Sequence, residues 1–185
     1  MLDINNIKSG KNIILNGEPY AVLYHEHSKT GRASAVLRTK IKNLITGAVL
    51  EKTFQGSDKI GEAEISKSKA QYLYNEKSDF HFMDSDTYDQ FSLPQNILDS
   101  AVNYLIEGTE ITVLNFNGSP VNIELPIKIK LKVTEAPPGL KGDTASGGDK
   151  SVTLETGLRI TVPLFIKEGD EVIVNTEKGD YVSRA

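Results

Sequence analysis

The chain of 185 residues has no cysteine, no tryptophan and only three histidines, and it contains no long apolar run. The absence of thiols excludes disulfides, cysteine nucleophiles and cysteine-based metal sites. A membrane-spanning helix needs about 18 or more apolar residues in succession, so none is predicted. The first residues, MLDINNIKSGKNIIL, lack the apolar core of a signal peptide. We therefore expect a protein of a reducing compartment, the cytoplasm, with no membrane partner.

Residues suited to catalysis or metal binding are sparse. His25 and His27 lie two apart and would share one face of a strand, but no further ligand follows in a known metal-site spacing. There is no G-x-S-x-G motif. A small hydrolase would need an acid–base pair in a pocket, and no spacing nominates one. We predict that the chain is not an enzyme and holds no metal and no cofactor; a His25–His27 metal pair is the open alternative.

Two loop-like segments resemble ligand-binding motifs only in part. In GDTASGGDKS, residues 142–151, Gly148 occupies the position where a phosphate loop has lysine, and no helix is predicted to follow. This segment is interpreted as a flexible loop or as a glycine-rich loop whose backbone approaches another polymer closely. The acidic run DSDTYD, residues 84–89, lacks the calcium-loop pattern and is interpreted as a turn or a helix cap.

Charge is unevenly distributed behind a net value of −4. Residues 1–63 hold nine Lys/Arg against six Asp/Glu, residues 64–128 hold four against ten, and residues 129–185 hold eight against nine. Exposed charges act over only about 8 Å at physiological salt. A locally basic first third can therefore contact RNA, whereas the acidic middle third is unsuited to close phosphate contact.

Strand patterns dominate the sequence. Asn16-Gly17 and Asn117-Gly118 each separate two β-rich runs, which is typical of tight hairpins. IKIKLKV, residues 127–133, alternates with period two and predicts a half-buried strand. Four aromatic residues also alternate along predicted strands and are interpreted as core rather than as a base-stacking platform: Tyr72, Tyr74, Phe80 and Phe82.

One helix and three units are predicted. LPQNILDSAVNYLIEG, residues 93–108, has apolar residues at helical spacing, Pro94 in the first turn and Gly108 as a stop. Breaks near residues 56–69 and at Leu125-Pro126 divide the chain into units 1–63, 64–127 and 128–185. Units of this size bury only about 60% of their unfolded surface, so at least two should pack together. Short strands at regular spacing predict an all-β protein of small barrels.

The segment SKTGRASA, residues 28–35, lies between two long predicted strands and is named here the tip loop. Flanking strands of this length extend about 25 Å, at roughly 3.3 Å per residue, and would hold the loop away from the core. Arg32 does not deprotonate in proteins, so it cannot serve as a base. Its role is then binding or attachment of a longer group, unless it is simply a solvated surface arginine.

Motifs in a fixed order cover nearly the whole chain: NGEPYAVL, KTGR, KIKNLITGAVLEKTF, YLYN, FMDSDTYDQ, ELPIKIKLKVTEAPPGLKGDTASGG and TGLRITVPLFIKEGDEVIVNTEKGDYVSR. Together with the length and the ending, they make the chain similar to bacterial elongation factor P. One position departs from the family pattern, because Val152 stands where the C-terminal motif usually has alanine.

The resemblance implies three β-barrel domains, an SH3-like or KOW-like N-terminal domain and two OB-folds, in an L-shaped arrangement that imitates tRNA. It implies a monomeric factor that binds both ribosomal subunits between the peptidyl and exit tRNA sites and relieves stalling at consecutive prolines. The expected partners are the ribosome and peptidyl-tRNA, with no DNA. The tip loop would reach the CCA end of the peptidyl-tRNA.

The resemblance also implies roles for individual residues. Arg32 matches the branch of the family in which a rhamnosyltransferase, with a dTDP-rhamnose donor, glycosylates the tip arginine; Lys29 is a weaker rival for modification. Lys29, Thr30 and Gly31 would shape the loop beside the tRNA. Further expected RNA contacts are Arg38, Lys40 and Lys42 on one strand face, the loop residues Gly142, Asp143 and Thr144, and, in the terminal GDYVSR, Tyr181 and Arg184. For Tyr181, packing remains an equal alternative.

Two rival functions stay open at this point. A general OB-type binder of single-stranded RNA would rest on stacked aromatics, and the low aromatic content of 7% argues against it. A divergent paralogue of the same factor, with a narrower role, is separated less well by sequence alone.

Overall fold

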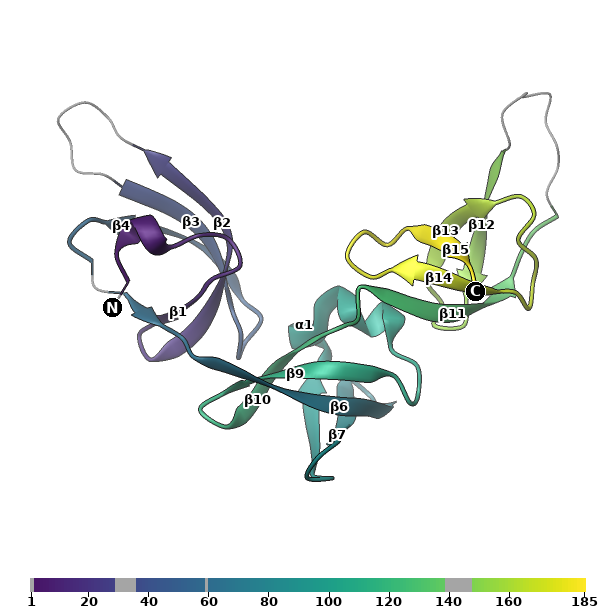
Figure 1. Ribbon diagram of the computed structural model, residues 1–185, viewed down its shortest axis with the longest axis horizontal. Helices are drawn as coiled ribbons and strands as arrows, with labels where there is room; N and C mark the ends of the chain where they lie inside the picture. Colours follow the sequence, from purple (N-terminus) through teal and green to yellow (C-terminus); the bar gives the residue numbers. More distant parts are fainter. Residues whose placement is uncertain (1, 29–35, 59, 139–147) are drawn as a thin grey trace.

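A computed structural model describes residues 2–28, 36–58, 60–138 and 148–185. Within these ranges the protein is built from three antiparallel β-sheets of five strands each, and the prediction of an all-β protein is confirmed. The sheets follow one another along the chain, and Figure 1 shows them in a bent row with the second sheet at the bend. No helix in the described ranges is long and apolar enough to cross a membrane.

The first sheet has the order β4-β3-β2-β1-β5. Its elements, with a short 3-10 helix at Ile4–Asn6, are β1 (Asn12–Leu15), β2 (Glu18–Ser28), β3 (Val36–Asn43), β4 (Val49–Gln55) and β5 (Gly61–Glu62). Asn16 and Gly17 have φ of 53° and 86°, so the predicted tight hairpin is present between β1 and β2. Ile13, Val22, Leu37, Ile41 and Phe54 fill the core beneath the sheet.

The second sheet has the order β10-β9-β6-β7-β8. Its strands are β6 (Ile65–Glu76), β7 (Asp79–Asp84), β8 (Gln90–Pro94), β9 (Glu110–Phe116) and β10 (Ser119–Glu124). Tyr72, Phe80 and Phe82 lie in its core, as predicted. Tyr74 does not: the register of β6 against β7 shifts between Tyr72 and Tyr74, and this bulge turns Tyr74 to the exposed face.

The predicted continuous helix over residues 93–108 is wrong. The structure has one α-helical turn, α1 (Gln95–Leu98), followed by a 3-10 helix, η2 (Asp99–Tyr104). The break lies at Asp99, whose φ of 54° and ψ of −125° no α-helix can continue. The apolar spacing nevertheless serves the core, because Leu98 and Leu105 are both buried beneath the second sheet.

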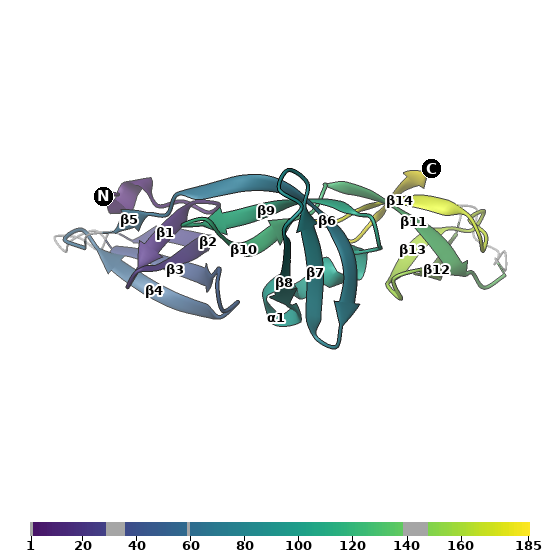
Figure 2. The same cartoon turned by 90° about the horizontal axis from the view of Figure 1, so that it is seen from below.

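The third sheet has the order β13-β12-β11-β14-β15. Its strands are β11 (Lys128–Glu135), β12 (Asp149–Leu154), β13 (Arg159–Pro163), β14 (Glu171–Asn175) and β15 (Tyr181–Arg184). The alternation predicted for β11 is confirmed, since Leu131 and Val133 are buried while the preceding lysine of each, Lys130 and Lys132, is exposed. Seen from below in Figure 2, the three sheets form an elongated molecule.

The three units touch at two junctions, as the small size of each unit predicts. At the first junction Asn96 Nδ2 donates to the Thr46 carbonyl at 3.1 Å, and Lys42 Nζ lies 3.7 Å from Asp99 Oδ2. At the second, Thr176 Oγ1 donates to the Pro126 carbonyl at 2.7 Å. Tyr104, from η2, is buried in the core of the third sheet. The middle unit is therefore held to both of its neighbours by specific contacts.

Candidate nucleic-acid interface

The strand β3 divides its side chains between two faces. Leu37, Thr39 and Ile41 are buried, and Thr39 Oγ1 donates to the Lys52 carbonyl at 2.8 Å. Arg38 and Lys40 point to the opposite, exposed face, with the less exposed Lys42 in line with them. The period of two in a strand thus places the three predicted cations on one face, as their spacing requires.

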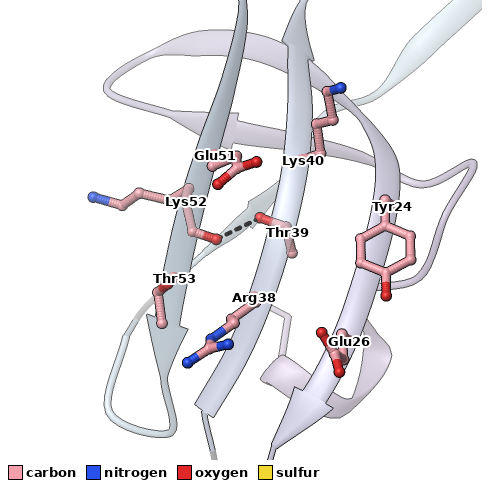
Figure 3. Close-up of a pocket in the computed structure, with 8 residues that line it drawn as sticks. All are labelled: Tyr24, Glu26, Arg38, Thr39, Lys40, Glu51, Lys52 and Thr53. Carbon is pink, nitrogen blue, oxygen red and sulfur yellow. Dashed lines mark hydrogen bonds between the residues drawn. The ribbon is translucent and has the colours of Figure 1, made fainter.

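This exposed face forms a shallow hollow of about 490 Å³ across β2, β3 and β4. Its lining residues, drawn in Figure 3, are Tyr24, Glu26, Arg38, Thr39, Lys40, Glu51, Lys52 and Thr53. The strand register sets Glu26 opposite Arg38 on one side and Glu51 opposite Lys40 on the other. The hollow therefore mixes both signs of charge, and its cations are partly balanced by neighbouring carboxylates.

Tyr24 is a member of this hollow that sequence reasoning missed. The residue is 55% exposed and stands opposite Lys40 in the strand register. The pairing of β2 with β3 shifts between Val22 and Tyr24, so Val22 is buried and Tyr24 is not. An exposed aromatic ring beside two cations can stack on a base or sugar while the cations contact phosphate. Strict alternation along β2 hides this arrangement, and no local sequence signal marks the bulge.

Lys42 differs from the other two predicted cations. Its side chain is only 18% exposed and ends 3.7 Å from the Asp99 carboxylate, at the first junction between units. It also borders a separate hollow of about 330 Å³ that includes Asp99 and Tyr104 from the middle unit and Thr176 from the third. The position suits a link between units better than contact with an external phosphate.

The strands β2 and β3 carry the tip loop at their ends. Ser28 and Val36 face each other in the ladder, so residues 29–35 start and finish at adjacent strand ends. The tip residues themselves, Lys29, Thr30, Gly31 and Arg32, lie outside the described residues, and so do Gly142, Asp143 and Thr144.

His25, one of the two histidines considered for a metal pair, is engaged locally. Its Nδ1 accepts a hydrogen bond from the Ser9 backbone N–H at 3.2 Å, and the Ser9 hydroxyl lies 3.0 Å away. The ring meets that of His27 edge-on, with centroids 6.1 Å apart. Across the ranges that the structure describes, no group of three His, Asp or Glu side chains is placed to hold a metal ion.

The two predicted contact residues at the C-terminus have intramolecular neighbours. Tyr181 packs against the core of the third sheet, which supports the packing alternative for this residue. Arg184 is exposed, with its Nε 4.0 Å from Asp170 Oδ1. Because that distance is at the limit of an ion pair and the guanidinium is exposed, Arg184 stays available to an external anion.

Comparison with known proteins decides the family. The chain matches three family models in order: the elongation factor P KOW-like domain over residues 3–60, the elongation factor P OB domain over 65–123 and the elongation factor P C-terminal domain over 129–184. Elongation factor P of Moorella thermoacetica is 45% identical, and that of Carboxydothermus hydrogenoformans is 44% identical, each over 100% of both chains. The chain belongs to the elongation factor P family.

Membership of the elongation factor P family confirms the resemblance drawn from the motifs, and it makes the chain a translation factor with OB-fold domains. The fold is shared more widely. A solved structure, eukaryotic translation initiation factor 5A from Methanococcus jannaschii, superimposes with a TM-score of 0.52 at 22% identity, covering 64% of this chain and 88% of that chain. This second likeness concerns the fold alone.

Proposed function

We propose that this member of the elongation factor P family binds the ribosome between the peptidyl and exit tRNA sites and relieves stalling at consecutive prolines. The observation that carries the proposal is the full-length match to elongation factor P, with all three domains in order. The unit boundaries are proposed at 63/64 and 127/128, which fall in the gaps between the matched ranges. We place the factor in the cytoplasm as a monomer.

The proposed mechanism is positioning rather than chemistry, and the ribosome forms the peptide bond. Holding the reacting groups in a near-attack geometry lowers the entropic part of a barrier by several kcal/mol. The paired strand ends Ser28 and Val36 would present the tip loop, with Lys29, Thr30 and Gly31 beside Arg32, to the CCA end of the peptidyl-tRNA. We propose that a rhamnosyltransferase extends the Arg32 guanidinium with rhamnose from a dTDP-rhamnose donor.

Other RNA contacts follow from the exposed face of the first sheet. Arg38 and Lys40, with the Tyr24 ring beside them, would contact the peptidyl-tRNA backbone. Lys42 would serve mainly at the junction with Asp99. In the third unit, Gly142, Asp143 and Thr144 would approach RNA near the exit-site codon. Arg184 would add a phosphate contact there, and Tyr181 would support it from the core.

Translation of a Pro-Pro-Pro reporter in a strain lacking the native factor tests the proposal. The unaltered chain should restore the reporter, whereas Arg32→Ala and Arg32→Lys should not, because Lys keeps the charge but cannot accept rhamnose on a guanidinium. A reporter without consecutive prolines is the control and should be unchanged. If Arg32→Ala restores the Pro-Pro-Pro reporter fully, the proposed role of the tip is wrong.

A peptide mass map of residues 25–40 tests the modification separately. Protein from its native source should carry one added deoxyhexose on Arg32. An unmodified Arg32, or a modification on Lys29 instead, would overturn the rhamnose proposal while leaving ribosome binding to the first test.

A further inference from the structure

An aromatic stack lies on the outer face of the β6–β7 hairpin, which projects from the middle unit in Figure 2. The rings of Tyr74 and His81 are cross-strand partners with centroids 4.6 Å apart and planes at 20°. Tyr74 is 51% exposed, although burial of an aromatic ring is the stable alternative. The bulge between Tyr72 and Tyr74 turns this ring outward. The exposure of Tyr74 therefore follows from an irregularity in the strand pairing.

Two pairs nearer the turn, and on the same face of the hairpin as Tyr74 and His81, the cross-strand partners are two carboxylates. Glu76 stands directly opposite Asp79, an arrangement that destabilises a sheet because like charges face each other. Lys77 follows in the turn, with φ of 56°. None of the ion pairs found in the described part of the chain involves Glu76, Lys77 or Asp79. Within the described residues, the two carboxylates therefore have no cationic partner, and they share a face of the hairpin with an exposed aromatic stack.

We propose that this hairpin face, formed by Tyr74, His81, Glu76 and Asp79, binds an arginine-bearing segment of a protein partner. A guanidinium is planar and weakly hydrated, so it stacks on an aromatic ring while its N–H groups donate to carboxylates at the ring's edge. The ammonium of lysine is compact and strongly hydrated and cannot do both in one plane. Binding would also relieve the repulsion between Glu76 and Asp79.

Charge favours a cationic protein segment over nucleic acid as the occupant of this face. Residues 64–128 carry four Lys/Arg against ten Asp/Glu, and the two carboxylates stand two positions along the same hairpin face from the stack. A base stacked on Tyr74 would bring its phosphate next to them. On the other side of β7, Ser92 faces His81 and Gln90 faces Met83, so the surroundings of the stack are mostly polar rather than apolar. An arginine among small or polar residues fits both the negative charge of this face and its polar surroundings.

The test uses the whole ¹⁵N-labelled chain and three probes: the blocked peptide Gly-Arg-Gly-Arg-Gly-Arg-Gly, its lysine counterpart and a six-residue oligouridylate. Because the ribosome is absent, failure here is distinct from failure of the proposed function. The arginine peptide should shift the amide signals of Tyr74, Asp79 and His81 and bind about threefold or more tightly than the lysine peptide, as expected for stacking on an exposed ring. Equal affinity for both peptides, or shifts elsewhere only, would overturn the proposal.

Matched variants separate the stack from general acidity. Tyr74→Ala should remove the preference for arginine over lysine, whereas Phe165→Ala, at an exposed aromatic residue of the third unit, should leave it intact. Glu76→Gln with Asp79→Asn should weaken binding of both peptides and raise the melting temperature, while the exposed Glu168→Gln changes neither. Binding of the oligouridylate at Tyr74 would instead assign the face to RNA and refute the proposal.

Discussion

Asn96 Nδ2 donates to the backbone carbonyl of Thr46 across the junction between the first and second units, at 3.1 Å. The adjoining Gly47 has φ of 74°, and a Cβ placed on it would lie 2.6 Å from the Asn96 carbonyl oxygen. The Thr46-Gly47 turn between β3 and β4 therefore packs backbone against backbone on the start of α1. The junction depends on the absence of a side chain at residue 47.

Gly47→Ala should destabilise the protein through two separable effects. The left-handed φ costs a non-glycine residue about 1 kcal/mol, and the overlap with the Asn96 oxygen adds a further loss by forcing the units apart. Gly10→Ala is the matched control, since Gly10 has φ of 86° but no atom within 4 Å of its Cβ position. Chemical denaturation should show the larger loss for Gly47→Ala. Equal losses would mean that the junction tolerates the methyl group.

Asp99 occupies a backbone region that glycine favours, with φ of 54° and ψ of −125°. Asp99→Gly should therefore be more stable than Asp99→Ala, by about 1 kcal/mol, which reverses the usual advantage of alanine over glycine. Both variants remove the ion pair with Lys42, so that contribution cancels in the comparison. Thermal unfolding of the two variants shows which of them is more stable. A more stable alanine variant would show that residue 99 relaxes to an ordinary conformation without cost.

Tyr104 carries the second junction, because η2 of the middle unit places its ring in the core of the third sheet. Tyr104→Ala should cost about 3 kcal/mol by leaving a cavity there. Tyr104→Phe keeps the ring and should cost far less. Hydrogen exchange should locate the loss in β11 to β15 first, and a loss confined to the second sheet would contradict the assignment of this ring to the third core.

Stability should fall in alkaline solution. Burial raises the pKa of Tyr72 and of Tyr104, with Glu107 adding to the effect at Tyr72 and Asp180 at Tyr104. An unfolded tyrosine ionises near pH 10, whereas these two stay neutral in the fold to higher pH. Their contribution is complete below pH 10 and is lost as the pH rises from there through the folded pKa values. Replacing both by phenylalanine should flatten the decline of the unfolding free energy above pH 10.

The salt dependence of ribosome binding should distinguish the three cations of β3. Arg38→Ala and Lys40→Ala should each weaken binding and reduce the slope of log affinity against log salt by about 0.7 to 0.9, as expected for one lost phosphate contact. Lys42→Ala should leave the slope nearly unchanged because its side chain is mostly buried beside Asp99. Sedimentation with purified ribosomes at several salt concentrations gives the slopes. Equal slopes for the three variants and the unaltered protein would refute the proposed phosphate contacts of Arg38 and Lys40.

Local sequence chemistry predicted the hairpins well. Asn16-Gly17 and Asn117-Gly118 adopt positive φ at both residues. Only a few residue types accept this conformation readily, so the dipeptide alone predicts the turn. The alternation of Lys130, Leu131, Lys132 and Val133 likewise fixed both the strand and its buried face. In these cases the physical cause is contained within a few neighbouring residues.

Features that depend on distant partners were not predictable. The bulges before Tyr24 and Tyr74 break the alternation that would otherwise bury both rings, and each is defined only against the opposing strand. The helix predicted over 93–108 breaks at Asp99, which lies at the junction beside Lys42, 57 residues earlier in the chain. Nothing near Lys42 in the chain indicates its contact with Asp99, and its predicted contact with RNA stays a prediction.

The ladder between β2 and β3 also sets how far the first unit reaches. Between the partners Val22–Ile41 and Ser28–Val36 the paired strands advance at about 3.3 Å per residue. Adding one residue pair to both strands would lengthen the arm by that step and exchange its two faces, whereas two pairs would restore the faces at about twice the added length. The length of the β2–β3 hairpin and the direction in which its end faces can thus be varied one residue pair at a time. A partner that binds the end of this hairpin would be sensitive to the insertion of a single pair.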